Sequence, residues 1–224
     1  ITIESGSEIC AMNKSLEVLN QHKMAYSRNS HIAGFTPIKE GFVLAVETKE
    51  DKERKYTSEL HIYDNNLVKK GEHSLAESGT YFPTEVISHD NQIIIAGYNL
   101  AGSIFDSKTI EGLFVRTLNM DGTEKSTNKF SWDLLKKTLK NSADGDFVFN
   151  GKISVLVEEI IPTEDGYTIV CESYSNNSGK TAAEFVLGSD DNRVVAVYDF
   201  VVFDTDKNGS LTNVRIFKKD AMNI

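Results

Sequence analysis

Two stretches of the chain, SEICAMNKSLEVLNQHKM at 7–24 and SELHIYDNNLVKKGEHSL at 58–75, decide the fold. They align without a gap, and Ser7, Glu8, Leu16 and His22 fall on Ser58, Glu59, Leu67 and His73. Repetition on this scale is typical of stacked or radial architectures, because one unit alone cannot bury its apolar face. The alignment therefore predicts a repeat protein.

A second kind of segment recurs along the chain. It occurs as FTPIKEGFVLAVET at 35–48, TEVISHDNQIIIAGYN at 84–99 and EEIIPTEDGYTIVCESY at 158–174. Each copy has two apolar runs around an acidic-Gly or acidic-Asn pair, which supplies the positive φ that a two-residue hairpin turn needs. These pairs are Glu40-Gly41, Asp90-Asn91 and Asp165-Gly166. We therefore expect three hairpins.

A further hairpin is expected after each of these, at 58–75, 112–132 and 193–219. Four sequential antiparallel strands with an apolar centre and a polar outer strand are typical of a β-propeller blade. The sequence thus predicts one all-β, propeller-like domain over 1–224. It has three complete blades at about 31–75, 82–132 and 152–219, and a partial blade at 1–24.

The number of blades raises the question of closure. Known propellers use about 4 to 8 blades, because wedge-shaped sheets have to fill a circle. The sequence provides fewer complete blades than that. We therefore expect these residues to be part of a longer protein, or another chain to complete the ring.

The stretch FDTDKNGSL at 203–211 has the spacing of a calcium loop, with Asp204, Asp206 and Asn208 as candidate ligands. In the repeat register, however, it falls on the turn between the third and fourth strands, where Asn, Asp and Gly are common. An EF-hand loop also needs a bidentate Glu at its twelfth position, which is Arg215 here. We expect a hairpin turn, with a weak calcium site as the alternative, and no other cofactor.

An insertion after the second blade contains SWDLLKKTLK, which predicts a short helix near 131–141. Ser131 is suited to the N-cap, and Trp132, Leu135 and Leu139 fall on one helical face. The favoured interpretation is a helix that covers an apolar edge of the blades. The alternative is that these three residues bind a partner, because insertions often carry function.

Composition excludes several classes of function. The formal net charge is -9, which gives no global attraction for a nucleic acid backbone. Apolar runs are far shorter than the about 18 residues of a membrane-spanning segment. No histidine lies near another His, a Cys or an acid at metal-ligand spacing, so no histidine metal site is expected. Cys10 and Cys171 are each interpreted as a small buried apolar residue on a strand, with a single bridge between them as the alternative.

Three long segments resemble a known family: FSWDLLKKTL at 130–139, GKISVLVEEIIPTEDGYTIVCESY at 151–174 and VVAVYDFVVFDTDKNGSLTNVRIFKK at 194–219. They are similar to uncharacterised, propeller-like Bacteroidota proteins that are secreted or held in the cell envelope. The resemblance implies a periplasmic, cell-surface or secreted location. It implies no catalytic or binding residue.

Two functions fit these observations. The first is a non-enzymatic binding or scaffold module that contacts another envelope protein or a glycan through propeller loops. The alternative is a carbohydrate-active hydrolase or lyase with its site at the propeller axis. Glu85, Glu158 and Glu159 fall on strands expected near that axis, and a glycosidase needs two converging acids. The sequence alone assigns no catalytic residue.

Overall fold

The structure is a computed structural model that describes residues 8–12, 14–23, 30–49, 56–75, 81–100, 110–139, 154–176 and 195–218. Strands account for nearly all the regular structure in these ranges, as the sequence predicts. The one helix among them is α1 (Trp132–Thr138). No helix in the described ranges has the length and apolar character needed to cross a lipid bilayer.

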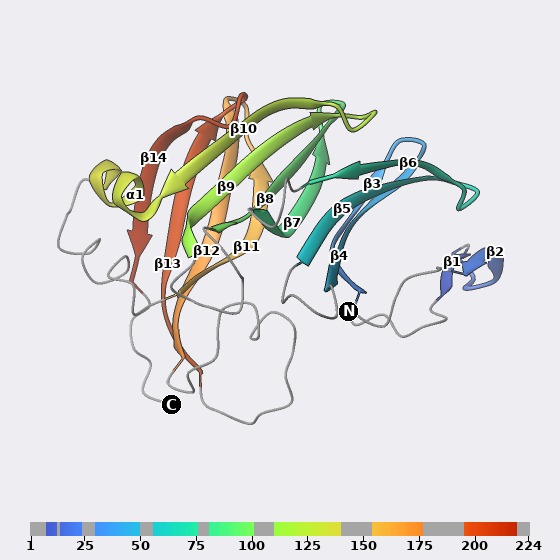
Figure 1. Cartoon of the computed structure of the whole chain (residues 1–224), viewed down its shortest axis with the longest axis horizontal. Coiled ribbons are helices and arrows are strands. Elements are labelled where there is room, and N and C mark those ends of the chain that lie inside the picture. The colour runs from blue at the N-terminus through green and yellow to red at the C-terminus, as the bar shows by residue number, and fades with distance from the viewer. Residues whose placement is uncertain are drawn as a thin grey trace.

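The described residues form three four-stranded antiparallel sheets and one hairpin (Figure 1). The first sheet contains β3 (Ser30–Ile38), β4 (Gly41–Lys49), β5 (Tyr56–Asp64) and β6 (Lys69–Ser74). The second sheet contains β7 (Tyr81–His89), β8 (Gln92–Leu100), β9 (Ile110–Asn119) and β10 (Glu124–Ser131). The third sheet contains β11 (Ser154–Pro162), β12 (Gly166–Asn176), β13 (Val195–Asp206) and β14 (Leu211–Phe217). The N-terminal hairpin consists of β1 (Glu8–Met12) and β2 (Val18–Lys23).

In every sheet the strands pair in chain order, so the predicted four-stranded antiparallel units are confirmed. Residues 1–7, the start of the predicted partial blade, lie outside the described residues.

The turn between the third and fourth strands is the same in all three sheets. Each turn has one residue in the left-handed region, and the amide of that residue donates to the carbonyl three residues earlier. In the first, second and third sheets, respectively, this residue is Leu67 (φ 63°), Gly122 (φ 84°) and Gly209 (φ 79°). The N-terminal hairpin has Leu16 (φ 62°) at this place. A leucine in this region is uncommon. Its presence at both Leu16 and Leu67 therefore supports the sequence alignment of the two hairpins.

The turns between first and second strands are less uniform. Asp90 (φ 47°) and Asn91 (φ 59°) both have positive φ, which is the type I′ geometry that the sequence predicts. The prediction is wrong for Asp165 and Gly166, because neither has a positive φ. There the amide of Thr163 donates to the carbonyl of Gly166 and closes a longer turn.

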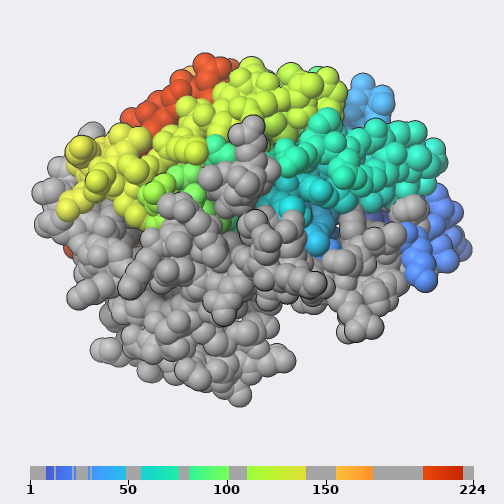
Figure 2. Space-filling view, in the orientation of Figure 1, coloured from blue at the N-terminus to red at the C-terminus, as the bar shows by residue number. Residues whose placement is uncertain are grey.

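The first strands bring the sheets together, since β3 and β11 both lie against β7. Each of these strands has a bulge at a similar place, at 32–34, 83–85 and 157–159. At Gly34 a Cβ atom would clash with the Val86 side chain of β7, so glycine allows the close approach of the two strands. Figure 2 shows the sheets following one another across the surface. The described sheets form an open series and not a closed ring.

Apolar cores fill the spaces between neighbouring units. One core, with Leu60 and Phe114, lies between the first and second sheets, and another, with Val115 and Phe203, lies between the second and third. A third core covers the other face of the first sheet, where Ile9 of β1 packs against it. Each unit therefore buries one face against the next, as repeat proteins do.

Polar contacts between neighbouring units recur at equivalent positions of the units. The Asn20 side-chain amide donates to the carbonyl of Asn66, at 2.6 Å, and the Ser126 hydroxyl donates to the carbonyl of Asn208, at 2.8 Å. In both cases the last strand of one unit contacts the outer turn of the next. His73 of β6 likewise lies against Gly122. The N-terminal hairpin is therefore placed against the first sheet as the first sheet is placed against the second.

Candidate functional site

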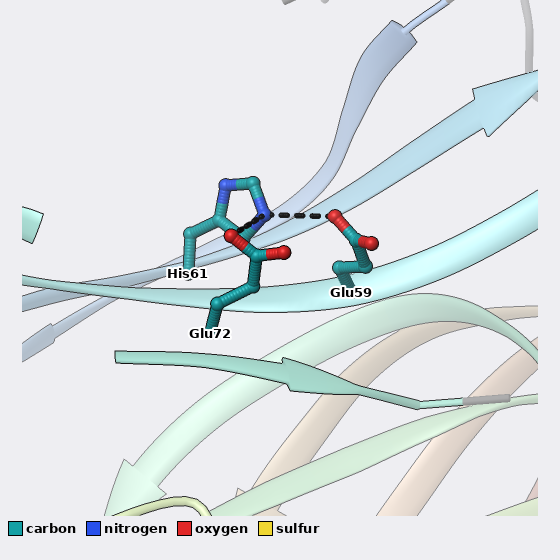
Figure 3. Close-up of side chains that lie close together, drawn as sticks. All are labelled: Glu59, His61 and Glu72. Carbon is teal, nitrogen blue, oxygen red and sulfur yellow. Dashed lines mark hydrogen bonds and ion pairs between the residues drawn. The ribbon is translucent and has the colours of Figure 1, made fainter. Parts of the chain in front are cut away.

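Three side chains of the first sheet converge on the face toward the N-terminal hairpin (Figure 3). Glu59 and His61 lie two residues apart on β5, so they share one face of the strand. Glu72 lies on β6 directly opposite His61. The His61 Nε2 atom is 3.0 Å from Glu59 Oε2 and 3.9 Å from Glu72 Oε2. We call these three residues the Glu-His-Glu cluster.

The cluster is buried at its centre and open at its edges. The His61 side chain is 4% exposed, whereas those of Glu59 and Glu72 are 35% and 51% exposed. Burial lowers the pKa of His61, and the hydrogen bond to Glu59 opposes this effect. Lys69 forms an ion pair with Glu72 and lowers the pKa of that carboxyl. The cluster thus offers one imidazole nitrogen and two carboxylates.

This cluster corrects the sequence interpretation that no histidine lies near an acid at metal-ligand spacing. The other sheets have Arg116 and Phe203 at the position of His61, counted from the positive-φ residue of the turn. Arg116 donates to the Leu75 carbonyl at 2.6 Å, and Phe203 is fully buried in the core. A histidine at this position is therefore not required by the repeat.

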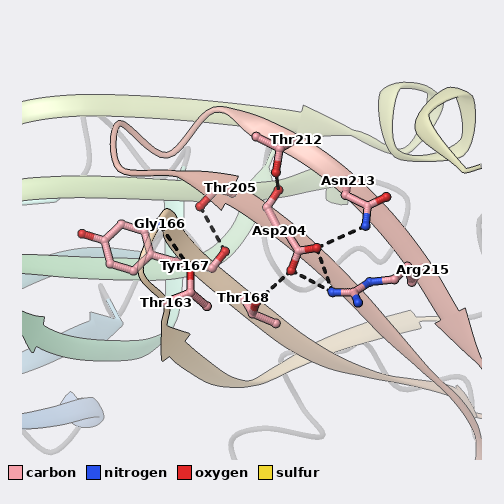
Figure 4. A network of polar contacts seen from close by, with 9 residues as sticks. All are labelled: Thr163, Gly166, Tyr167, Thr168, Asp204, Thr205, Thr212, Asn213 and Arg215. Atoms are coloured by element: carbon pink, nitrogen blue, oxygen red, sulfur yellow. Dashed lines mark hydrogen bonds and ion pairs between the residues drawn. The ribbon is translucent and has the colours of Figure 1, made fainter.

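The candidate calcium ligands make internal contacts, and Figure 4 shows those of Asp204. The Asp204 carboxylate accepts hydrogen bonds from Thr168 at 2.7 Å, Asn213 at 3.2 Å and Arg215 at 2.7 Å. The Asp206 carboxylate instead accepts the amides of Asn208 and Ser210 within its own turn, at 2.8 and 2.9 Å.

The backbone carbonyl of Asn208 accepts hydrogen bonds from the side chains of Ser126 and Asn128 in the second sheet. The Asp64 carboxylate caps the corresponding turn of the first sheet by accepting two amides. These contacts support the hairpin-turn interpretation, because the carboxylates of Asp204 and Asp206 and the backbone of Asn208 all hydrogen-bond within the fold.

Helix α1 packs against the core between the second and third sheets. Leu135 is fully buried there, and Trp132 and Leu139 are partly buried against the same core. The Trp132 indole donates to the carbonyl of Ile110 at 2.9 Å, and the Ser131 hydroxyl caps the helix. Packing of all three residues on the sheets supports the covering role over the partner-binding role.

The helix is shorter than the predicted 131–141. It ends at Thr138, because Leu139 has an extended backbone. Residues 140 and 141 lie outside the described ranges.

The acids expected near the axis are close to one another. Glu85 of β7 is half-buried, and burial raises its pKa, to which the charges of Glu159 and Glu158 on β11 add. Burial also raises the pKa of the Cys171 thiol, with Glu158 adding to the effect. The prediction of a buried strand residue is confirmed for Cys171 and wrong for Cys10, which is exposed on β1. Both cysteines are free, so the alternative of a bridge between them is also wrong.

A cavity of about 540 Å³ lies between the turns of the first and second sheets. Its apolar walls include Ile38, Ile62 and Met120. Charged groups surround them, among them Lys39 and Glu40 and the ion pair of Asp64 with Lys70, whose Oδ2 and Nζ atoms are 2.8 Å apart. The sequence predicts these turns, but not that turns of both sheets line one cavity.

No protein-family model matches the chain, and no curated protein matches it either. The geometry of these sites is therefore the basis for assigning a function.

Proposed function

We propose that the chain is a non-enzymatic binding module, an open arc of propeller-type blades that contacts a protein or a glycan through the turns at one end of its sheets. The observation that carries this proposal is the cavity between the turns of the first and second sheets. Its volume lies in the range of small-ligand sites, about 300–1,000 Å³.

The walls of the cavity suit a ligand with both apolar and polar parts. Met120 and Ile38 offer apolar contact for one face of a sugar ring or for a peptide side chain. Lys39, Glu40 and Asn91 offer donors and acceptors at the rim. Loops on a rigid β scaffold are common places for such recognition.

The arrangement of the sheets supports the propeller interpretation. Adjacent first strands at β3, β7 and β11 resemble the inner strands of blades around an axis, and the contacts from each fourth strand to the next turn repeat. The family resemblance adds an envelope location, periplasmic, surface-exposed or secreted, and an envelope protein or glycan as partner.

Binding to a glycan array and to a peptide library tests this function. We expect the ligand found with the wild-type chain to bind at least about tenfold more weakly to Met120→Trp, which fills the cavity, and to Lys39→Glu. Lys207→Glu is the charge-reversal control and should bind normally; it lies in the third sheet, at the turn position equivalent to Met120 of the second sheet. Absence of any ligand, or equal binding by all the variants, contradicts the proposal.

A second candidate function is a carbohydrate-active hydrolase or lyase. The observation that favours it is the half-buried Glu85, whose pKa is raised beside Glu158 and Glu159. An acid with a raised pKa near a second carboxylate is the arrangement that glycoside hydrolysis uses. A reducing-sugar assay on a polysaccharide panel should then detect activity that Glu85→Gln removes and Glu111→Gln, an exposed acid of β9, retains. Activity that survives Glu85→Gln rules out this site.

A further inference from the structure

We propose that the Glu-His-Glu cluster binds a divalent transition-metal ion, with Zn²⁺ as the ion that its donor atoms fit best. The inference does not depend on the binding function proposed above, because the cluster and the cavity use different residues.

The distances within the cluster suit one small ion. The three donor atoms lie within 4.8 Å of one another, and His61 Nε2 is 3.0 and 3.9 Å from the two carboxylates. Bonds of about 2.0–2.2 Å around a tetrahedral Zn²⁺ place neighbouring donors roughly 3.3–3.6 Å apart. The two measured separations lie on either side of this range. Small rotations of Glu59 and Glu72 therefore bring all three atoms around one ion.

The support and exposure of the side chains also fit a metal site. His61 is held by burial on the central part of β5, whereas Glu59 and Glu72 reach the solvent. Such a set provides three protein ligands on one side and leaves the other side for water, as in open zinc sites. The imidazole favours Zn²⁺ over Ca²⁺ or Mg²⁺, which take oxygen ligands. Two carboxylates balance the charge of the ion.

Lys69 is the competing group. Its ammonium pairs with the Glu72 carboxylate, so an ion has to displace this contact before Glu72 can bind it. Removal of the lysine charge therefore distinguishes a metal site from a simple ion-pair network. If the cluster is a metal site, Lys69→Met binds the ion more tightly than the wild type does. If it is only an ion-pair network, neither protein binds the ion.

Titration calorimetry with Zn²⁺ on chelator-treated full chain tests the site, with Co²⁺ absorbance as a second measurement. We expect one ion per chain. Glu59→Gln and Glu72→Gln should each weaken binding at least about tenfold, the loss usually seen even for residues outside the ligand shell. Lys69→Met should strengthen it. His89→Ala, which removes a half-buried turn histidine near Asp90, is the control and should bind as the wild type does.

Stability of the fold is checked by melting the metal-free variants, and both Gln variants should fold because their side chains are partly exposed. The proposal is overturned if the wild type binds no Zn²⁺. It is also overturned if the Glu59→Gln/Glu72→Gln double variant binds as tightly as the wild type, or if His89→Ala alone removes the binding.

Discussion

Replacement of Leu135 by alanine decides whether α1 covers the sheets or presents a partner-binding face. The side chain is fully buried in the core between the second and third sheets. Substitution of a buried leucine by alanine costs about 2–5 kcal/mol, and the value depends on how far the site can collapse. Trp132 and Leu139, which are partly buried against the same core, are the neighbours that would close over a shorter side chain. We therefore expect a loss in the lower half of this range, about 2–3.5 kcal/mol.

Urea unfolding gives the measurement. Trp132 is the only tryptophan and lies on the helix itself, so its fluorescence reports on α1, while far-UV circular dichroism reports on the sheets. At about 2–4 °C per kcal/mol for a chain of this size, the melting temperature should fall by roughly 4–14 °C. Leu134→Ala is the matched control on the same helix, with a side chain that is 41% exposed, and should cost clearly less.

A Leu135→Ala variant within about 0.5 kcal/mol of the wild type, with an unchanged urea dependence, would refute this reasoning, because surface substitutions have effects of that size. The partner-binding interpretation of Trp132, Leu135 and Leu139 would then be favoured.

Two further predictions concern the turn at Asp206 and the buried Glu47. Asp206→Ala removes the acceptor of two turn amides and should lower the free energy of unfolding by about 1 kcal/mol, equally with and without millimolar calcium. A calcium-dependent rise in the wild-type melting temperature that Asp206→Ala abolishes would contradict the turn interpretation. Burial raises the pKa of Glu47 well above its unfolded value of about 4.3. Above about pH 4.3 the native state therefore keeps a proton that the unfolded state loses, so the stability of the protein falls as the pH rises from there. The stability of Glu47→Gln relative to the wild type should therefore increase from pH 4 to pH 8 in urea unfolding, and parallel pH profiles would contradict this.

Local patterns predicted the strands well, because alternation and turn residues act within a few positions. Asp90 and Asn91 form the expected turn, and the match of Leu16 with Leu67 is reproduced in their shared backbone conformation. The length of α1 was not predictable in this way. The spacing of Trp132 and Leu135 defines the packed face, but the helix ends where the backbone of Leu139 becomes extended.

The Glu-His-Glu cluster could not be predicted from the sequence, because it depends on how two strands pair. Sequence alone places Glu59 and His61 on one face of a strand, but the position of Glu72 depends on the register of β6. A bulge between Ile62 and Tyr63 shifts that register by one residue and sets Glu72 opposite His61. Without the shift, Glu72 would lie on the opposite face, since a one-residue slip turns every side chain over.

The face of the third sheet that points away from the second sheet is polar, which is relevant to where a further blade can pack. In the first and second sheets, the paired positions that face the next sheet are Val43 with Ile62 and Ile94 with Thr117, all of them buried. The same paired positions in the third sheet are Thr168 and Asp204.

Asp204 forms an ion pair with Arg215, and their side chains are 25% and 47% exposed. A further apolar blade on this face would have to remove water from both charges, which costs free energy that their mutual attraction often fails to recover. Polar outer faces of this kind cap the ends of repeat arrays. The N-terminal hairpin differs, because Leu16 and Leu19 are 78% and 68% exposed on it. If another blade or chain extends this arc, the distribution of charge and apolar surface favours the N-terminal hairpin as the place where it packs.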